Sequence, residues 1–440
     1  MDRKYIKATK ELIDFIKDSP TSFQAAESMS RILEKEGFRR LYEFDADWDL
    51  AEGGKYYVER NQSSLIAFSV PLGYERSFML CASHSDSPTY RLKAESEDTA
   101  FGRYIKLDTE GYGGMIASSW LDRPLSIAGR AVVRTKTGVE SRLVKVDRDL
   151  LLIPNVDIHQ NRKLNDGFVY NPAVDMMPLF AEAGRKGVLK KIIAETAGCG
   201  EEDLVSFDMF LYNRTPGTIW GADSEFFSSP RIDNLMCAYS SLMGFIAAVR
   251  KKSAKAVPVY ACFDNEETGN MTKQGAASTF LFDTLSRICE KTGMDLRSSL
   301  PSSFMLSCDN GHAVHPNHPE LSDRLNGPHI NGGVVIKFNA AQKYASDAVS
   351  CGIFSEICRK AGIPVQNQAN RSDLPGGGTL GAVATTKVTL NTVDIGMAQI
   401  AMHSSYETAG TKDTYYLTEA CRAFYSTVIR SGFDGSFDIL

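Results

Sequence analysis

The chain has 440 residues, of which 43% are hydrophobic and 23% charged, and its formal net charge is -5. This length allows one large domain or, as we expect, two, and the slightly acidic balance provides no basic field for binding nucleic acid. The sequence has no apolar run at its N-terminus and no uninterrupted apolar stretch of about 18 residues, so we expect no signal peptide, no membrane span and a cytoplasmic location.

The nine cysteines are scattered along the chain, and none of them forms a Cys-x-x-Cys pair. Several stand within apolar runs that are typical of strands, among them Cys81, Cys262 and Cys308. We therefore expect reduced and buried thiols, as in a cytoplasmic protein, and neither a disulfide framework nor a zinc site with sulfur ligands.

The N-terminal part of the chain is predicted to form two helices followed by strands. Apolar residues recur at helical spacing over residues 5–18 and again from about 22 to 37. Strands are expected over 64–70 and 78–83, and the second of these leads directly into His84.

Residues from about 93 to 228 have a different pattern. Short β-like runs over 104–107, 126–135 and 142–146 are separated by glycine and aspartate turns, so this block is expected to be rich in strands. A polar, loop-like stretch within the block contains its only histidine, His159.

From residue 230 onward, helices and strands alternate, which is typical of a sheet flanked by helices. The pattern predicts helices over 234–252, 273–292, 347–361 and 417–431, and strands over 257–263, 303–308, 334–338, 363–367 and 388–393. The strand before His84 fits the same pattern, but the alternation of helices and strands resumes only after residue 229. We therefore expect a discontinuous α/β domain, residues 1–92 and 229–440, interrupted by an inserted β-rich domain, residues 93–228.

Residue types that bind metals follow the apolar runs of the predicted α/β domain. The run that ends at Phe263 is followed closely by Glu266 and Glu267. Repulsion between the two carboxylates and their desolvation disfavour the charged forms unless a cation neutralises them. An isolated acidic pair is more often a solvated turn, but similar junctions supply five further candidates: His84, Asp86, Asp233, Asp309 and His403. Because ligands bind at the carboxyl edge of open α/β sheets, we expect these side chains to share one site.

Carboxylate and imidazole ligands without thiolates suit zinc, with manganese and cobalt as alternatives, in a hydrolytic site. A pair of divalent ions needs one bridging carboxylate and, for each ion, one histidine and one further acid. The candidates fit this requirement. Asp233 is assigned as the bridge, His84 and Asp309 as ligands of one ion, and Glu267 and His403 as ligands of the other.

Two acids remain after this assignment. Glu266 is suited to act as general base, taking a proton from the water that attacks the substrate and giving it to the leaving amine. Asp86, two residues after His84, is suited to hold the second ring nitrogen of that histidine.

These segments resemble the aspartyl aminopeptidase family of dinuclear zinc metallopeptidases, in its bacterial form, nearly from end to end. The resemblance is carried by segments in the family's order: Ser83–Pro88, Pro230–Leu235, Asp264–Glu267, His312–Pro316 and Ala401–Ser404, joined by Gly333–Lys337 and Lys343–Ser346. It implies a mixed-sheet catalytic domain flanked by helices and interrupted by a β-rich dimerisation domain. It also implies an aminopeptidase of the EC 3.4.11 type that removes N-terminal residues, often Asp or Glu, from peptides.

The resemblance further implies residues and partners that the spacing does not indicate. Lys337 resembles the cation of the first substrate pocket, although a lysine on a strand usually faces water. His159 resembles a histidine that reaches the active site of a neighbouring subunit, and the alternative role for this residue is a metal ligand. The family's assembly is a homo-oligomer, a dodecamer built from dimers, and no nucleic-acid or membrane partner is expected.

Two other functions are compatible with the same residues. One is an amidohydrolase or deacylase that acts on N-acyl amino acids with the same metals. The other is a catalytically silent scaffold that uses the fold for assembly, although none of the proposed ligands is missing from the sequence.

Overall fold

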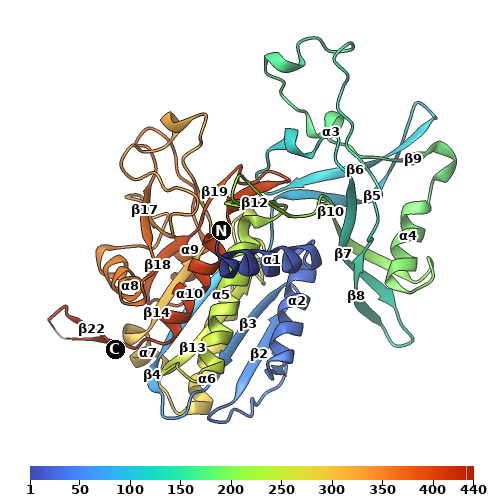
Figure 1. Ribbon diagram of the computed structural model, residues 1–440. Helices are drawn as coiled ribbons and strands as arrows, with labels where there is room; N and C mark the ends of the chain where they lie inside the picture. The colour runs from blue at the N-terminus through green and yellow to red at the C-terminus, as the bar shows by residue number, and fades with distance from the viewer. Residues whose placement is uncertain (433) are drawn as a thin grey trace.

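The computed structural model describes residues 1–432 and 434–440, and a nine-stranded mixed sheet forms its centre (Figure 1). The strands follow one another across this sheet in the order β1 (Arg39–Leu41), β2 (Lys55–Arg60), β3 (Ser64–Ser69), β13 (Ala256–Phe263), β4 (Glu75–His84), β14 (Phe304–Cys308), β18 (Asn391–Gly396), β16 (Val334–Phe338) and β17 (Val365–Ala369). Strands β13, β4, β14 and β18 are neighbours and run parallel, so their carboxyl ends lie at one edge.

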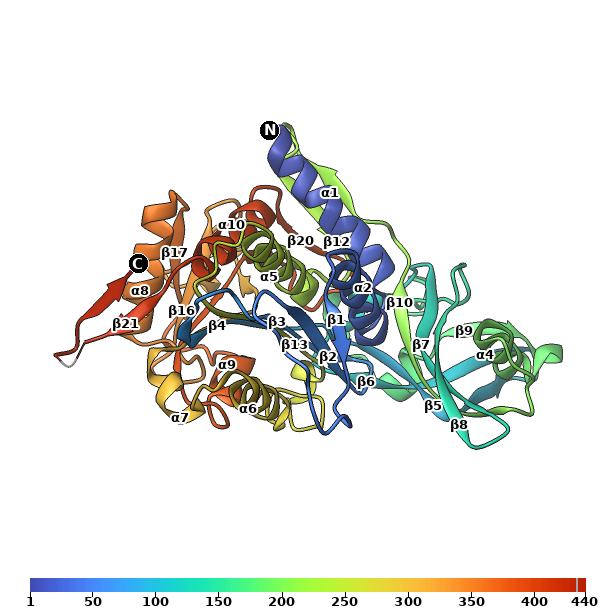
Figure 2. The same cartoon turned by 90° about the horizontal axis from the view of Figure 1, so that it is seen from below.

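Helices cover both faces of this sheet, as Figure 2 shows. One face packs against α1 (Arg3–Asp18), α2 (Ser22–Lys35), α5 (Ile232–Arg250), α8 (Ala348–Ala361) and α10 (Asp413–Tyr425). The other face packs against α6 (Phe280–Thr292), α7 (Leu296–Ser299) and α9 (Leu380–Ala384). Strand β4 contributes to both cores because its side chains alternate, with Cys81 facing the first core and Leu80 the second.

A six-stranded antiparallel sheet stands beside the central sheet and has its own core (Figure 1). Its order is β8 (Val139–Lys145), β7 (Leu125–Arg134), β10 (Leu204–Asn213), β5 (Thr89–Ala100), β6 (Tyr104–Tyr112) and β9 (Leu179–Glu182), and it carries α3 (Pro172–Asp175) and α4 (Val188–Ala197). All of its strands come from within residues 89–213. The predicted insert, residues 93–228, has different bounds, because the first strand begins at Thr89 and the strand Phe226–Ser229 pairs with Glu407–Gly410 in another sheet. The inserted domain stays a proposal.

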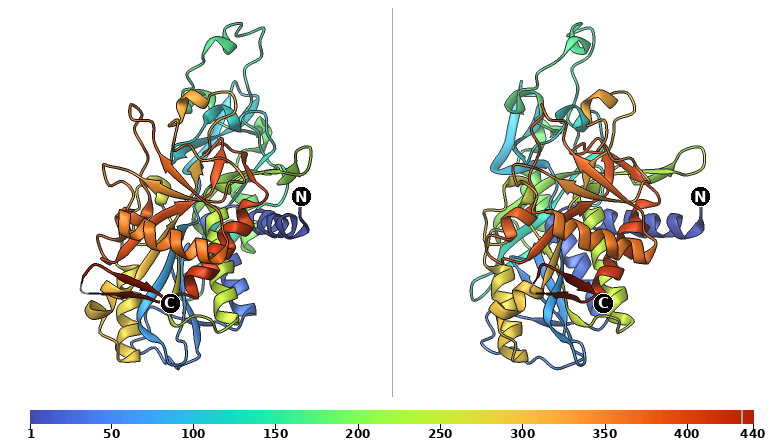
Figure 3. Two further views of the ribbon diagram at one scale, coloured as in Figure 1. Left: turned by 60° about the vertical axis from the view of Figure 1, so that its left-hand side comes forward. Right: turned by 90° about the vertical axis from the view of Figure 1, so that its left-hand side faces the viewer.

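Two smaller sheets complete the described part of the chain. The five-stranded one has the order β11 (Thr218–Trp220), β12 (Phe226–Ser229), β20 (Glu407–Gly410), β19 (Ala398–Ile400) and β15 (Gly311–His312), and the two-stranded one pairs β21 (Ile429–Ser431) with β22 (Phe437–Ile439). The amino group of Met1 pairs with Asp223, between β11 and β12, at 3.0 Å. Figure 3 shows that this end of α1 projects from the body of the molecule.

Helix α5 is the longest and most apolar of the core helices. Among the described residues it alone has the length and composition to cross a membrane, but 83% of its most apolar window is buried inside the protein. It packs against β4 and α10 at the centre of the first core. The nine cysteines are free, and all except Cys199 are buried, as the sequence predicts.

Two helices differ from their predicted bounds by four residues or more. Helix α6 begins at Phe280 and not at residue 273, because the chain first folds into a turn in which Gly275 lies against the backbone of Asn270. Helix α10 covers Asp413–Tyr425 and not 417–431. It ends where the hydroxyls of Ser426 and Thr427 bond to carbonyls of its last turn, after which the chain forms the β21–β22 hairpin.

Candidate active site

The parallel strands bring the predicted ligands together at their shared carboxyl edge. His84 is the last residue of β4, Glu266 and Glu267 lie in a 3-10 turn directly after β13, and Asp309 follows β14. Asp233 lies in the first turn of α5. His403 follows β19 in the five-stranded sheet. We call these six residues the histidine–carboxylate cluster: His84, Asp233, Glu266, Glu267, Asp309 and His403.

Asp233 lies between the two histidines of this cluster. Its Oδ1 is 3.6 Å from Nε2 of His84, and its Oδ2 is 3.6 Å from Nε2 of His403. On the outer sides, Nε2 of His84 is 3.4 Å from Oδ1 of Asp309, and Nε2 of His403 is 3.4 Å from Oε2 of Glu267. The cluster therefore has two halves that share one carboxylate.

The residues of each half fit a metal ion. Ligand atoms of His84, Asp233 and Asp309 lie within 4.8 Å of one another, and so do those of Asp233, Glu267 and His403. Oδ1 of Asp233 is buried and has no hydrogen-bond partner among the described residues. Leaving a buried carboxylate oxygen unpaired is unfavourable, and a cation between these oxygen and nitrogen donors would satisfy it. The donor set is one that zinc and manganese accept.

Burial perturbs the pKa values of the acids in the cluster. It raises the pKa of Asp233 and of Glu267 well above the usual range, and it raises the pKa of Glu266 to about 7. Asp309 behaves differently. Burial also opposes its ionisation, but the charge of Lys337, together with His84, lowers its pKa to about 2.

Asp86 links several members of the cluster. Its two carboxylate oxygens accept hydrogen bonds of 3.1 Å from the backbone amides of Glu266 and Glu267, and Oδ1 lies 3.3 Å from Nδ1 of His84. The hydroxyl of Tyr112 donates a further bond of 2.7 Å to Oδ2. Asp86 therefore lies where the sequence analysis expects it, against the second ring nitrogen of His84, and it also fixes the turn after β13.

The segment after β6 holds His403 from the other side. Nδ1 of His403 lies 2.6 Å from the carbonyl oxygen of Gly114, and the amide of Ile116 donates to the carbonyl of His403 at 3.0 Å. A ring nitrogen that donates to a carbonyl leaves Nε2 with its lone pair directed at the shared carboxylate. Burial lowers the pKa of His403, which favours the neutral form that a metal requires.

Glu407 is a residue of the site that the sequence analysis missed. Its buried carboxylate accepts from the amide of Asp233 at 2.9 Å and from the amide of His403 at 2.7 Å, so it fixes the backbone of both. It begins strand β20 instead of following one, and the pattern of acids at strand ends therefore did not include it. The spacing of four residues from His403 is the only sequence signal that could have indicated it.

The two residues expected to contact substrate occupy different environments. Lys337, on β16, is only 2% exposed, and its Nζ donates to the carbonyl of Asn310 at 2.7 Å and lies 3.3 Å from Oδ2 of Asp309. His159 is exposed on a loop of the six-stranded sheet and does not line the cavity beside the cluster. Within one chain, the structure therefore brings Lys337 to the site and leaves His159 outside it.

A cavity of about 190 Å³ opens beside the cluster. All six cluster residues and Lys337 line it, together with the glycine-rich turn of residues 375–378. The space is sufficient for the first residue of a peptide next to the carboxylates and histidines.

The model of the family described as "Aminopeptidase I zinc metalloprotease (M18)" matches residues 15–425. This chain belongs to the M18 family of aminopeptidases. Membership confirms the resemblance, and the fold class, a mixed α/β structure, agrees with that of the family's solved structures. The protein is accordingly an aminopeptidase and a hydrolase of a metalloprotease family, and a divalent metal is implied.

Relatives named "Probable M18 family aminopeptidase 2" are similar along nearly the whole chain. The protein of Clostridium acetobutylicum is 44% identical over 432 residues, which are 96% of this chain and 99% of the relative. The protein of Pseudomonas aeruginosa is 36% identical over 426 residues, 94% of this chain and 97% of the relative.

Solved structures show the same fold. The chain in the Ape4 and Nbr1 complex has a TM-score of 0.93 and 32% identity, with 97% of this chain and 87% of that chain covered. The S. cerevesiae mApe1 dodecamer has a TM-score of 0.83 and 26% identity, with 96% and 97% covered.

Proposed function

We propose that this M18 aminopeptidase holds two divalent ions within the histidine–carboxylate cluster. Zinc is the metal we expect first, and manganese and cobalt are the alternatives. His84 and Asp309 would hold one ion and Glu267 and His403 the other, with Asp233 shared between them. The observation that carries this proposal is the position of Asp233, whose two oxygens face the two histidines at equal distances of 3.6 Å.

The residues around the cluster would perform the proton transfers of peptide hydrolysis. When bound, the ions would polarise the scissile carbonyl and favour deprotonation of the attacking water. Glu266 is the member of the cluster without an assigned ligand role, and it lines the cavity beside the proposed ligands, where a carboxylate can take a proton from water and release it. We propose that it removes the proton of the attacking water and delivers it to the amine of the departing peptide.

Recognition of an acidic first residue is proposed for Lys337. An ammonium group has three donors, and two of them are directed at the carbonyl of Asn310 and the carboxylate of Asp309. The third remains for a carboxylate of the substrate in the adjoining cavity. This arrangement supports a preference for peptides that begin with Asp or Glu.

The assembly proposed for this chain is a homo-oligomer in which the six-stranded sheet contributes to the dimer. The description of the S. cerevesiae relative as a dodecamer supports a dodecamer built from dimers. Because His159 lies outside the site of its own chain, we propose that it reaches the site of a neighbouring subunit, as a substrate contact or a metal ligand. A cytoplasmic location stays a prediction.

A substrate panel tests the reaction. Metal-loaded protein should release the first residue from dipeptide amides with a free N-terminus. Removal of the metal by a chelator should abolish this activity, and addition of zinc should restore it. If the protein hydrolyses only N-acylated amino acids, the result favours the deacylase. If the protein contains no metal and has no activity after purification in the presence of metal, the result favours the scaffold.

A further inference from the structure

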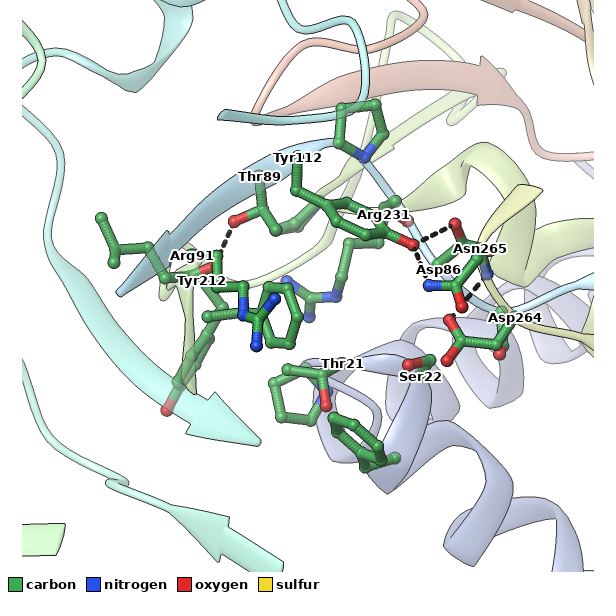
Figure 4. Close-up of a pocket in the computed structure, with 18 of the residues that line it drawn as sticks. Thr21, Ser22, Asp86, Thr89, Arg91, Tyr112, Tyr212, Arg231, Asp264 and Asn265 are labelled. Carbon is green, nitrogen blue, oxygen red and sulfur yellow. Dashed lines mark hydrogen bonds between the residues drawn. The ribbon is translucent and has the colours of Figure 1, made fainter. Parts of the chain in front are cut away.

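A second cavity, of about 300 Å³, is lined by Asp86 and borders the histidine–carboxylate cluster at Asp233. Its lining comes from the start of α2, the six-stranded sheet, the segment after β4, the turn after β13, the residues at the start of α5, among them Arg231, and the segment that leads into β20. Figure 4 shows the side chains of Arg91 and Arg231 directed into this space, with Asp86 and Asp264 at another part of its wall. The proposed reaction uses none of the cavity's arginines.

The part of the lining that carries the arginines has more positive than negative charge. Arg91 and Arg130 share a single carboxylate, that of Asp208, at 2.7 and 2.9 Å. Arg231 donates only to the backbone carbonyls of Ser19 at 3.1 Å and Ile16 at 3.0 Å, and it forms no ion pair within the described part of the chain. Three guanidinium groups therefore line one cavity with one carboxylate between them.

The remaining acids of the cavity do not neutralise this part of the lining. Asp86 already accepts three hydrogen bonds from Tyr112 and the two glutamate amides, and Asp233 and Glu407 are engaged at the cluster. Burial raises the pKa of Asp264 to about 7, which reduces its charge at neutral pH. An arginine that lacks a carboxylate partner retains several N–H donors, and its planar group matches carboxylate or phosphate oxygens.

The cavity also has an apolar side. Phe23 and Phe210 line it with ring centroids 6.4 Å apart, and Tyr212 lies beside Arg231. The first turn of α2 reaches the cavity at Thr21, whose side chain forms no cap to the helix, so backbone amides there add partial positive charge. The lining therefore suits a ligand that has one anionic group and an apolar body.

We propose that this cavity binds a small organic anion, a carboxylate or phosphate ester, with its charged group between Arg91 and Arg231 and its apolar part against Phe23 and Phe210. The site joins the six-stranded sheet to the start of α2, and bound anion stabilises that junction. It does not depend on the proposed reaction, since none of its guanidinium groups belongs to the cluster.

The test is isothermal titration calorimetry on metal-loaded, full-length protein with three probes that share an aromatic ring. We expect phenyl phosphate, benzoate or both to bind once per chain and neutral benzyl alcohol to show no binding. The anion with the higher affinity identifies the preferred group. Arg91→Gln should weaken binding about tenfold or more, because a charge-assisted pair is lost. Arg91 has a 42% exposed side chain and is expected to tolerate the change.

Arg142→Gln is the matched control, because Arg142 lies in the same sheet, pairs with Glu140 and does not line the cavity. It should bind the anions as the wild type does. The proposal is contradicted if neither anion binds. It is also contradicted if the anions bind equally well to Arg91→Gln and compete with a dipeptide substrate, because they would then occupy the metal centre.

Discussion

The hydroxyl of Tyr112 donates a hydrogen bond of 2.7 Å to the carboxylate of Asp86. Tyr112 is the last residue of β6 in the six-stranded sheet, whereas Asp86 follows β4 of the central sheet and contacts His84. Asn265 donates to the same hydroxyl at 2.8 Å, so the tyrosine is held on both sides. One side chain of the proposed inserted domain thus helps to position the cluster.

We predict that Tyr112→Phe weakens metal binding without unfolding the protein. The change removes one hydrogen bond to Asp86, and loss of such an outer contact typically lowers metal affinity about 10- to 100-fold. Titration with a chelating indicator measures the affinity. Tyr90→Phe is the control, because Tyr90 is a buried tyrosine of the same sheet that packs on Trp120. Equal affinities in wild type and Tyr112→Phe would show that the bond does not position the site.

Two neighbouring glutamates should respond differently to the same substitution. Glu266→Gln is expected to keep its metal content and to lower kcat by about 10²- to 10⁴-fold, since only the proton acceptor is lost. Glu267→Gln should instead lose one metal per chain. Metal analysis and kcat on one dipeptide amide separate the two outcomes. Wild-type turnover in Glu266→Gln would exclude it as the base.

Lys337→Ala should reduce kcat/KM most for peptides that begin with Asp or Glu. The lysine also supports Asp309, so we expect a smaller loss for peptides that begin with alanine or leucine as well. A panel of dipeptide amides varied only at the first residue, run on both proteins, measures the ratio. A uniform loss across the panel would restrict Lys337 to holding Asp309 and remove it from substrate selection.

Asp413 provides a pH-dependent contribution to stability away from the cluster. Its side chain is fully buried, with Oδ2 accepting from the amide of Asn331 at 2.8 Å, and burial raises its pKa from 3.8 to about 8. Between these values the folded protein holds a proton that the unfolded chain releases. The free energy of unfolding should therefore fall as pH rises from about 4 to about 8, by at most about 1.4 kcal/mol per pH unit.

Chemical unfolding of wild type and Asp413→Asn across this pH range tests that contribution. The amide cannot titrate, so the difference in stability between the two proteins should shift in favour of the variant as pH rises. Contributions of the metal centre are common to both and cancel in the comparison. Parallel stability curves would show that Asp413 ionises normally in the folded protein.

The strand pattern predicted that the central residues of the histidine–carboxylate cluster lie close together, because these proposed ligands follow strands. Parallel neighbours share a carboxyl edge, so the positions of His84, Glu267 and Asp309 follow from the strand pattern. Tyr112 and Glu407 could not be found in this way. Their partners, Asp86 and Asp233, lie 26 and 174 residues away, and only the packing of separate elements brings them together.

Boundaries were predicted less well than elements. The start of α6 was expected seven residues too early because Gly275 and its neighbours are compatible with a helical pattern, whereas close backbone packing on Asn270 requires a turn. The arginine-lined cavity had no signal in the sequence. Arg91, Arg130 and Arg231 come from three distant segments, and each alone is typical of a surface residue.

The most direct measurement is an anomalous difference map at the zinc edge from crystals of the zinc-loaded protein. We predict two peaks per chain, about 3.5–4 Å apart, one between His84 and Asp309 and one between Glu267 and His403, with Asp233 touching both. A single peak, or peaks that lie away from Asp233, would contradict the two-ion account.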